Sequence, residues 1–255
     1  MPDSLTNKPA WVDLSTNDAA AAGEFYAGLF GWHTHVSDDP QYGGYATAHL
    51  GDDSVAGIGP KQDPNQPTAW SLYIGTDDVD RLAQRVTDAG GSVVAPPFDV
   101  GDQGRMAVFQ DPSGGFISAW QPGGEHSFVS GRPNSFGWAE LTARNVEQVL
   151  PFYEGVFGWT RRSSEYDPSE PPYHELNSDG VAILGALEMS PQIPAQVPTY
   201  WQVYFNVADV DAEFRRALEL GATELVGPSD FPGGRFALVT DPQGAAFGLL
   251  NVEPR

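Results

Sequence analysis

The chain has 255 residues, and its 13 Lys and Arg against 34 Asp and Glu give a formal net charge of −21 at pH 7. A field of this sign repels phosphate backbones and anionic lipids, which makes nucleic acids and membrane surfaces poor partners. Cysteine is absent, so disulfides and thiolate metal sites are excluded and metal binding is left to His, carboxylate and amide groups.

Residues 1–8 carry neither the basic start nor the apolar run of a signal peptide, and no apolar stretch is long enough to span a bilayer. We therefore expect a soluble cytoplasmic protein, monomeric or homodimeric, whose partner is a small molecule. The acidic surface is expected chiefly to keep the protein soluble, although it can also attract a cationic ligand.

The predicted elements repeat along the chain. A strand-like run leads each time into a helix that follows Asp18, Asp78, Asn145 or Asp209, residue types that cap helix N-termini. The predicted helices are Ala19 to Leu29, Val79 to Ala89, Val146 to Val156 and Val210 to Leu220, each ending near a glycine. About three short strands follow each helix, separated by Gly, Pro and Asp turns.

The two halves of the chain are duplicates. The phrase "FYAGLFGW" at residues 25–32 returns as "FYEGVFGW" at residues 152–159, inside a longer ungapped match of residues 11–32 with 138–159. Residues 104–115, "GRMAVFQDPSGG", likewise match "GRFALVTDPQGA" at residues 234–245. The repeat predicts an α+β fold of four βαβββ modules that close against one another in pairs, with helices outside and the aromatic phrases in the core.

The first strand of each module divides into two faces, because strand side chains alternate. One face is apolar and should pack under the helices: Val12, Leu14, Leu72, Ile74, Ala139, Leu141, Val203 and Phe205. The other face should point away from the helices and carries candidate ligand-binding residues: Trp11, Asp13, Ser71, Tyr73, Trp138, Glu140, Gln202 and Tyr204. Aromatic walls with a few polar groups are typical of small-molecule pockets. The alternative is that the tryptophans fill core and the acids lie on an open, wet face.

With these features the chain resembles the vicinal oxygen chelate superfamily, which includes glyoxalase I, bleomycin-resistance proteins and extradiol dioxygenases. The resemblance rests on the four modules, the "FY-x-G-h-FGW" phrase and the "DPSGG" and "DPQGA" turns at Asp111 and Asp241. It implies two tandem domains, residues 1–122 and 134–255, each a pair of modules curled into a cup-shaped, half-open barrel. The segment between them, residues 121–134, is rich in Gly, Pro and Ser, as linkers are.

The resemblance also implies a divalent metal held by His, Gln or Glu on first strands and by Glu on last strands. The matching first-strand positions here are Trp11, Ser71, Trp138 and Gln202, of which Gln202 alone can ligate a metal. The matching late positions are Ser118 and Gly248. We therefore expect no metal site and no cofactor of the family type, since an open catalytic metal needs two or three protein ligands.

The histidines and two arginines give further candidates. His49 shares its predicted strand face with Tyr45 and can form an acid–base pair with Asp13. Tyr45, and Tyr173 on the matching strand of the second half, are further candidate ligand-binding residues. His33 and His35 share a strand face and can grip a metal, but no carboxylate partner is apparent; His126 and His174 receive no role. Arg105 and Arg235 recur at one place in both halves and suit either an anionic ligand or surface acids.

Two functions follow as hypotheses. The first is a metal-independent protein that binds an aromatic or cationic small molecule and sequesters a toxic or antibiotic compound. The alternative is a lyase, isomerase or hydroxylase-like enzyme acting on a small carbonyl or aromatic substrate, with Asp13, His49 and Glu140 as catalytic groups. A purely structural role is left open, because a fold does not by itself determine a function.

Overall fold

A computed structural model describes residues 5–124, 127–164 and 171–252. His126 lies outside the described residues, as does part of the predicted linker. Among the described residues, no helix is long and apolar enough to cross a membrane.

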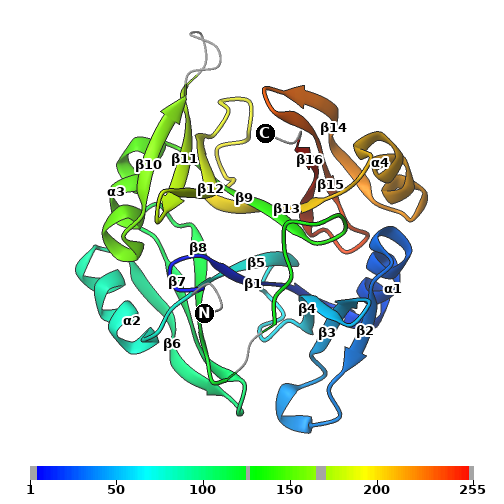
Figure 1. Cartoon of the computed structure of the whole chain (residues 1–255), viewed down its shortest axis with the longest axis horizontal. Helices are drawn as coiled ribbons and strands as arrows, with labels where there is room; N and C mark the ends of the chain where they lie inside the picture. Colours follow the sequence, from blue (N-terminus) through cyan, green and yellow to red (C-terminus); the bar gives the residue numbers. More distant parts are fainter. Residues whose placement is uncertain (1–4, 125–126, 165–170, 253–255) are drawn as a thin grey trace. The chain divides into compact units, whose positions relative to one another are not determined.

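The first half of the chain contains two βαβββ modules (Figure 1). The elements of the first module are β1 (Pro9–Thr16), α1 (Ala19–Phe30), β2 (His33–Val36), the short 3-10 helix η1 (Pro40–Tyr42), β3 (Ala46–Leu50) and β4 (Asp53–Pro60). Those of the second are β5 (Ala69–Gly75), α2 (Val79–Asp88), β6 (Ser92–Val100), β7 (Gly104–Gln110) and β8 (Phe116–Pro122).

The second half repeats this order. Its third module has β9 (Phe136–Ala143), α3 (Val146–Phe157), β10 (Thr160–Ser164), β11 (Tyr173–Ser178) and β12 (Val181–Glu188). Its fourth has β13 (Tyr200–Asn206), α4 (Val210–Glu219), β14 (Thr223–Phe231), β15 (Gly234–Thr240) and β16 (Ala246–Val252). The predicted helices are confirmed to within one residue at each end.

The strands form two open sheets with the same order, β2-β3-β4-β1-β5-β8-β7-β6 and β10-β11-β12-β9-β13-β16-β15-β14. In each module the first strand runs parallel to the last, as in the β1–β4 and β9–β12 pairs, and the remaining pairs are antiparallel. The predicted fold class, four βαβββ modules in half-open sheets, is confirmed.

The chain groups into two compact units. Unit 1 comprises residues 1–10, 72–126 and 139–201, and unit 2 comprises residues 11–71, 127–138 and 202–255. Unit 1 therefore holds most of the second and third modules, and unit 2 most of the first and fourth. Division into sequence-consecutive domains 1–122 and 134–255 stays a prediction.

Three of the four helix starts are capped as predicted. The Asp18, Asp78 and Asp209 carboxylates accept hydrogen bonds from backbone N–H groups in the first turn of their helices. The prediction was wrong for Asn145, which has a φ of 57° and makes no side-chain cap bond. Glu188 at the end of β12 replaces it, accepting bonds from the backbone N–H groups of Asn145 and Val146 at 2.8 Å each.

The apolar face of each first strand packs in the core as predicted, with every member of the set at most 1% exposed: Val12, Leu14, Leu72, Ile74, Ala139, Leu141, Val203 and Phe205. The repeated phrase is also core, because Tyr26, Phe30 and Trp32 are each at most 2% exposed and their rings contact one another. The opposite face of β1, including Trp11 and Asp13, is half-buried.

The tyrosine of the repeated aromatic phrase also makes buried hydrogen bonds. In unit 2 the Tyr26 hydroxyl donates to Asp241 Oδ2 at 3.1 Å and accepts from Trp70 Nε1 at 2.9 Å. Asp241 Oδ1 in turn accepts the backbone N–H groups of Gln243 and Ala245. The helix phrase of the first module is thus hydrogen-bonded to the "DPQGA" turn of the fourth.

Unit 1 contains the same contact, but here the tyrosine comes from the second half of the chain and the aspartate from the first half. The Tyr153 hydroxyl donates to Asp111 Oδ2 at 2.7 Å and accepts from Trp201 Nε1 at 3.0 Å. Burial, and next the aspartate charge, raise the pKa of both Tyr26 and Tyr153, so both phenols stay protonated donors. We call each Tyr–Asp–Trp set, 26–241–70 and 153–111–201, a turn lock.

Candidate functional site

A hydrogen-bonded trio lies on the face of the first module that points away from α1. Trp11 Nε1 donates to the Tyr45 hydroxyl at 2.8 Å, and that hydroxyl is also hydrogen-bonded to the Asp13 carboxylate. Burial, followed by the Asp13 charge, raises the pKa of the Tyr45 phenol. The structure therefore brings together three residues predicted to bind a ligand.

The trio depends on a glycine in the neighbouring strand. Asp13 of β1 is in register with Gly57 of β4, and Gly57 is in register with Thr47 of β3. A β-carbon on residue 57 would overlap the Tyr45 hydroxyl and would lie 3.0 Å from the Asp13 Cβ. Residue 57 must lack a side chain so that the Tyr45 ring can cross β4 and reach Asp13.

The third module, in unit 1, contains the matching pair. The Tyr173 hydroxyl donates to Glu140 Oε1 at 2.7 Å, and a β-carbon on Gly185, which is in register with Glu140, would overlap that hydroxyl. Tyr200 adds a second phenol, whose pKa is raised by burial and, to a smaller extent, by the Glu140 charge. Tyr200 is hydrogen-bonded to Thr142, and the Glu140 charge acts on its phenol.

The second and fourth modules have aromatic residues but no acid at these positions. Tyr73 is in register with Ser118 on β8, and both are buried. Tyr204 is in register with Gly248 on β16, and its ring fills the space where a side chain at residue 248 would begin. Ser71 and Trp138 are half-buried, and Gln202 is buried with Nε2 donating to the Val203 carbonyl at 3.1 Å.

The groups that act on His49 are other histidines and Asp52, whereas Asp13 was its expected partner. Burial, followed by the charges of His33 and His35, lowers the pKa of His49, while Asp52 acts in the opposite direction. Strand β4 lies between β3 and β1, and His49 is in register with Ser54 whereas Asp13 is in register with Gly57, so the His49 and Asp13 backbones are more than about 10 Å apart. A role of His49 as a base partnered by Asp13 stays a prediction.

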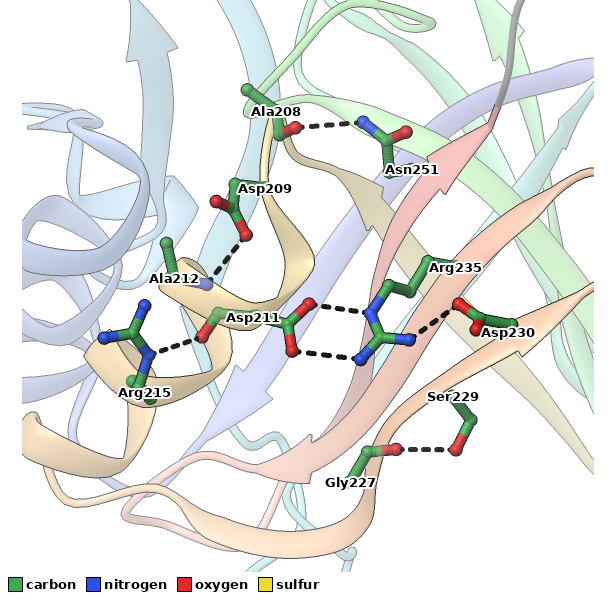
Figure 2. A network of polar contacts seen from close by, with 10 residues as sticks. All are labelled: Ala208, Asp209, Asp211, Ala212, Arg215, Gly227, Ser229, Asp230, Arg235 and Asn251. Atoms are coloured by element: carbon green, nitrogen blue, oxygen red, sulfur yellow. Dashed lines mark hydrogen bonds and ion pairs between the residues drawn. The ribbon is translucent and has the colours of Figure 1, made fainter.

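Arg105 and Arg235 bind surface acids at the helix starts. Figure 2 shows the Arg235 guanidinium with Asp211 of α4 on one side, at 2.7 and 3.0 Å, and Asp230 of β14 on the other, at 2.6 Å. Arg105 lies between the matching acids in unit 1, with Nη2 donating to both oxygens of Asp80 of α2 and Nη1 donating to Asp99 of β6. These contacts favour the second of the two roles considered for the arginines, and ligand binding by them stays a prediction.

Solvent reaches the ion pairs of Arg105 and Arg235, which limits how much they stabilise the fold. We expect Arg235→Gln to lower the stability of the fold only slightly, because ion pairs that solvent reaches are screened by water and salt. Urea denaturation at low and high salt measures the effect, which should shrink as salt is added. A large loss of stability that is insensitive to salt would contradict this assignment.

The metal positions of the family are filled differently in this chain. Among residues 5–124, 127–164 and 171–252, no group of three or more His, Asp or Glu side chains is placed to hold a metal ion. Gly57, Gly185 and Gly248 have tyrosine atoms where a side chain would project. A side chain at any of these three glycines would collide with Tyr45, Tyr173 or Tyr204. The absence of a family-type metal stays a prediction.

A separate cavity of about 240 Å³ lies in unit 1 where the N-terminal segment meets the start of α2. Its lining includes Thr6, Asp77 and Arg81, and the Asp78 that caps α2. It is smaller than a usual ligand pocket and largely lined by groups bonded to their own helix, so we do not place the site there.

Sequence reasoning missed Tyr200, Thr142 and the glycines that admit the tyrosine rings. Tyr200 and Thr142 have Ala69 and Ser15 as their first-half counterparts, so the internal repeat does not mark them. The glycines gave a signal, since "SVAGIGP" and "VAILGAL" each place one within a buried strand. A glycine inside a strand often marks a close approach of another group.

The tandem βαβββ modules with open sheets define a class of fold, and comparison with known proteins gives the family. A sequence model of the Glyoxalase/Bleomycin resistance protein/Dioxygenase superfamily matches residues 8–117 and again residues 135–249. The chain belongs to this superfamily.

Curated relatives match nearly the whole chain. DnrV of Streptomyces peucetius, an anthracycline biosynthesis protein, is 38% identical over 259 residues, which cover 96% of this chain and 93% of DnrV. CFP32 of Mycobacterium tuberculosis, named as a proposed glyoxylase, is 38% identical over 254 residues, covering 97% and 95%.

Solved structures share the fold. The Mn(II)-bound glyoxalase from Novosphingobium aromaticivorans has a TM-score of 0.66 at 19% identity, covering 96% of this chain and 82% of that one. The 2,3-dioxygenase LapB from Pseudomonas sp. KL28 has a TM-score of 0.65 at 16% identity, covering 99% and 96%. At these identities the likeness concerns the fold alone.

Proposed function

We propose that this protein binds an aromatic small molecule without a metal ion, using the carboxylate–phenol pairs Asp13–Tyr45 and Glu140–Tyr173. The single observation that carries the proposal is the repetition of one acid, one tyrosine and one strand glycine in the first and third modules. Buried polar networks of this kind restrict their residues to one geometry, which is a requirement for recognition.

The chemistry of the pairs supports a ligand rather than a metal. Each carboxylate is bonded to a phenol that fills the space where a side chain on the neighbouring strand glycine would project. Trp11 adds an indole to the first pair, and its ring also contacts Phe128 with centroids 5.5 Å apart. Aromatic surface beside an oriented acid suits a flat ligand that carries hydroxyl or amino groups.

The relatives indicate which chemical class of ligand to test. Similarity to DnrV over nearly the whole chain supports a polycyclic aromatic ligand, because that protein is named for anthracycline biosynthesis. Sequestration of such a compound would use affinity alone and would require no turnover.

Calorimetry with a dihydroxyanthraquinone, with and without a primary amine, tests this proposal. Metal-stripped protein should bind with the same affinity as untreated protein. Asp13→Asn and Glu140→Gln should each weaken binding at their own site by about tenfold or more, the worth of a hydrogen bond to a charged group.

Asp77→Asn, an exposed carboxylate beside α2, is the matched control and should leave binding unchanged. Binding that appears only after Mn²⁺ or Zn²⁺ is added would refute metal independence. If neither anthraquinone bound at high concentration, the proposal of an aromatic ligand would be refuted.

An acid–base enzyme is the second candidate, favoured by the 2.7 Å contact between Tyr173 and Glu140. A phenol and a carboxylate in contact can transfer a proton to or from a substrate. The likeness to CFP32 suggests 2-oxoaldehydes as first substrates, with catechols as the second set. Turnover lost in Glu140→Gln and Asp13→Asn, with substrate still bound, would support catalysis over sequestration.

A further inference from the structure

Three histidines gather on one edge of the first-module sheet. Strand β2 is the edge strand, and all four of its residues are exposed. In the antiparallel β2–β3 pair, His33 stands directly opposite His49 and His35 stands opposite Thr47. Because alternate residues of a strand share a face, His33 and His35 project to the same side.

His33 and His49 are in contact across the strands. Their rings are stacked with centroids 5.6 Å apart and 24° between the ring planes. The sequence suggests a pair along one strand, His33 with His35, whereas the structure gives His33 a cross-strand partner sixteen positions away. A pair fixed by two hydrogen-bonded strands loses little freedom when a ligand bridges it.

The electrostatics of this edge favour a cation. Imidazole coordinates metals in its neutral form. Asp52 lies close enough to act on His49, and the chain carries a net charge of −21. A negative field raises the local concentration of cations.

We propose that His33 and His49 form a surface binding site for one divalent transition metal ion, Cu²⁺, Ni²⁺ or Zn²⁺. Imidazole suits all three ions, with Cu²⁺ bound most tightly of the divalent series. Metal–nitrogen bonds of about 2 Å require the two ring nitrogens to approach within roughly 4 Å, and the ring centroids are 5.6 Å apart. Water completes the coordination.

This site differs from the family metal position and from the proposed ligand site. Strands β3 and β4 separate His33 from β1, which carries Asp13. The third module has no copy, since the residues opposite each other at the matching place are Thr160 and Asn177. His174, the remaining described histidine, is fully buried. One ion per chain is therefore expected.

The test uses full-length, tag-free protein treated with a chelator and dialysed. Titration calorimetry with Cu²⁺ should show one site, Cu²⁺ electron paramagnetic resonance should show nitrogen coupling, and Ni²⁺ or Zn²⁺ should raise the melting temperature by stabilising the β2 edge. His33→Asn and His49→Asn should each weaken Cu²⁺ binding by more than about tenfold, because one imidazole of the chelate is lost. His35→Asn is the matched control on the same exposed strand and should change the affinity by less than about threefold.

Absence of a one-equivalent Cu²⁺ site overturns the proposal, and so does wild-type affinity in both His33→Asn and His49→Asn. A loss in His35→Asn as large as in those variants also overturns the two-residue assignment. Circular dichroism of these surface variants verifies folding. Asp13→Asn should retain the metal site, so failure of the aromatic-ligand proposal and failure of this one are distinguishable.

Discussion

Asp111→Ala is expected to lower the free energy of unfolding by about 3–5 kcal/mol, because it leaves several buried donors without an acceptor. Asp111 is 4% exposed and accepts bonds from the Tyr153 hydroxyl, from the backbone N–H groups of Ser113 and Gly115, and from the Ser113 hydroxyl. Alanine supplies none of these bonds. Urea denaturation followed by tryptophan fluorescence gives the measurement.

The companion variant Tyr153→Phe separates the lock from the turn. It keeps the turn bonds of Asp111 and removes the phenol between Asp111 and Trp201, so we expect a smaller loss of about 1–3 kcal/mol. Asp38→Ala, an exposed carboxylate, should stay within about 0.5 kcal/mol of wild type. If Asp111→Ala cost no more than Asp38→Ala, the turn lock would not stabilise the fold.

The turn locks explain why the chain contains the same aromatic phrase twice. Each phrase provides a tyrosine for a turn in the opposite half: Tyr26 for Asp241 and Tyr153 for Asp111. A helix that only needed an apolar face could use phenylalanine in place of tyrosine. The hydroxyl adds direction, since a buried aspartate strongly favours the one arrangement that satisfies it.

Much of the fold could be predicted from the sequence because its signals are local. Alternation in "WVDL" separates Val12 and Leu14 from Trp11 and Asp13, and the structure confirms that the apolar pair is buried. The helix starts follow from aspartate caps, except at Asn145, where a glutamate 43 residues away supplies the acceptors. No local pattern reveals a cap that comes from another strand.

The candidate site was less accessible to sequence reasoning because it depends on strand register. Tyr45, Asp13, Tyr173 and Glu140 were each identified, but their pairing depends on which residue of β4 or β12 lies between them. The register places a glycine there in both modules. Thr142 shares the strand face of Glu140 on β9, whereas Tyr200 comes from the neighbouring strand β13, and no counterpart in the first half marks either residue.

The two halves have diverged on the same scaffold, which bears on the proposed function. In the first module His35 is paired across the strands with Thr47, and at the matching place in the third module Arg162 is paired with Glu175. Arg162 and Glu175 form an ion pair, and Glu175 is 5% exposed. The first pair includes Trp11, while the third-module pair includes Tyr200. Separate variants of each pair are therefore needed to find which one binds.

Gly57→Ala is expected to abolish binding at the first pair and to lower the free energy of unfolding by about 1–3 kcal/mol, the usual cost of forcing extra atoms into packed structure. The new methyl group would occupy the space of the Tyr45 hydroxyl and contact Asp13, so the ring must leave its place between Trp11 and the carboxylate. Gly185→Ala should do the same to Tyr173 and Glu140.

A double-mutant cycle tests the cause. Without the phenol there is nothing to displace, so Gly57→Ala should cost at least about 1 kcal/mol less in a Tyr45→Ala background than in wild type. Gly155→Ala is the control for the same chemical change: it lies on the exposed face of α3 with open space around it, and alanine should raise stability by about 0.5–1 kcal/mol. Equal costs of Gly57→Ala in both backgrounds would show that backbone strain, and not the tyrosine, sets the requirement for glycine.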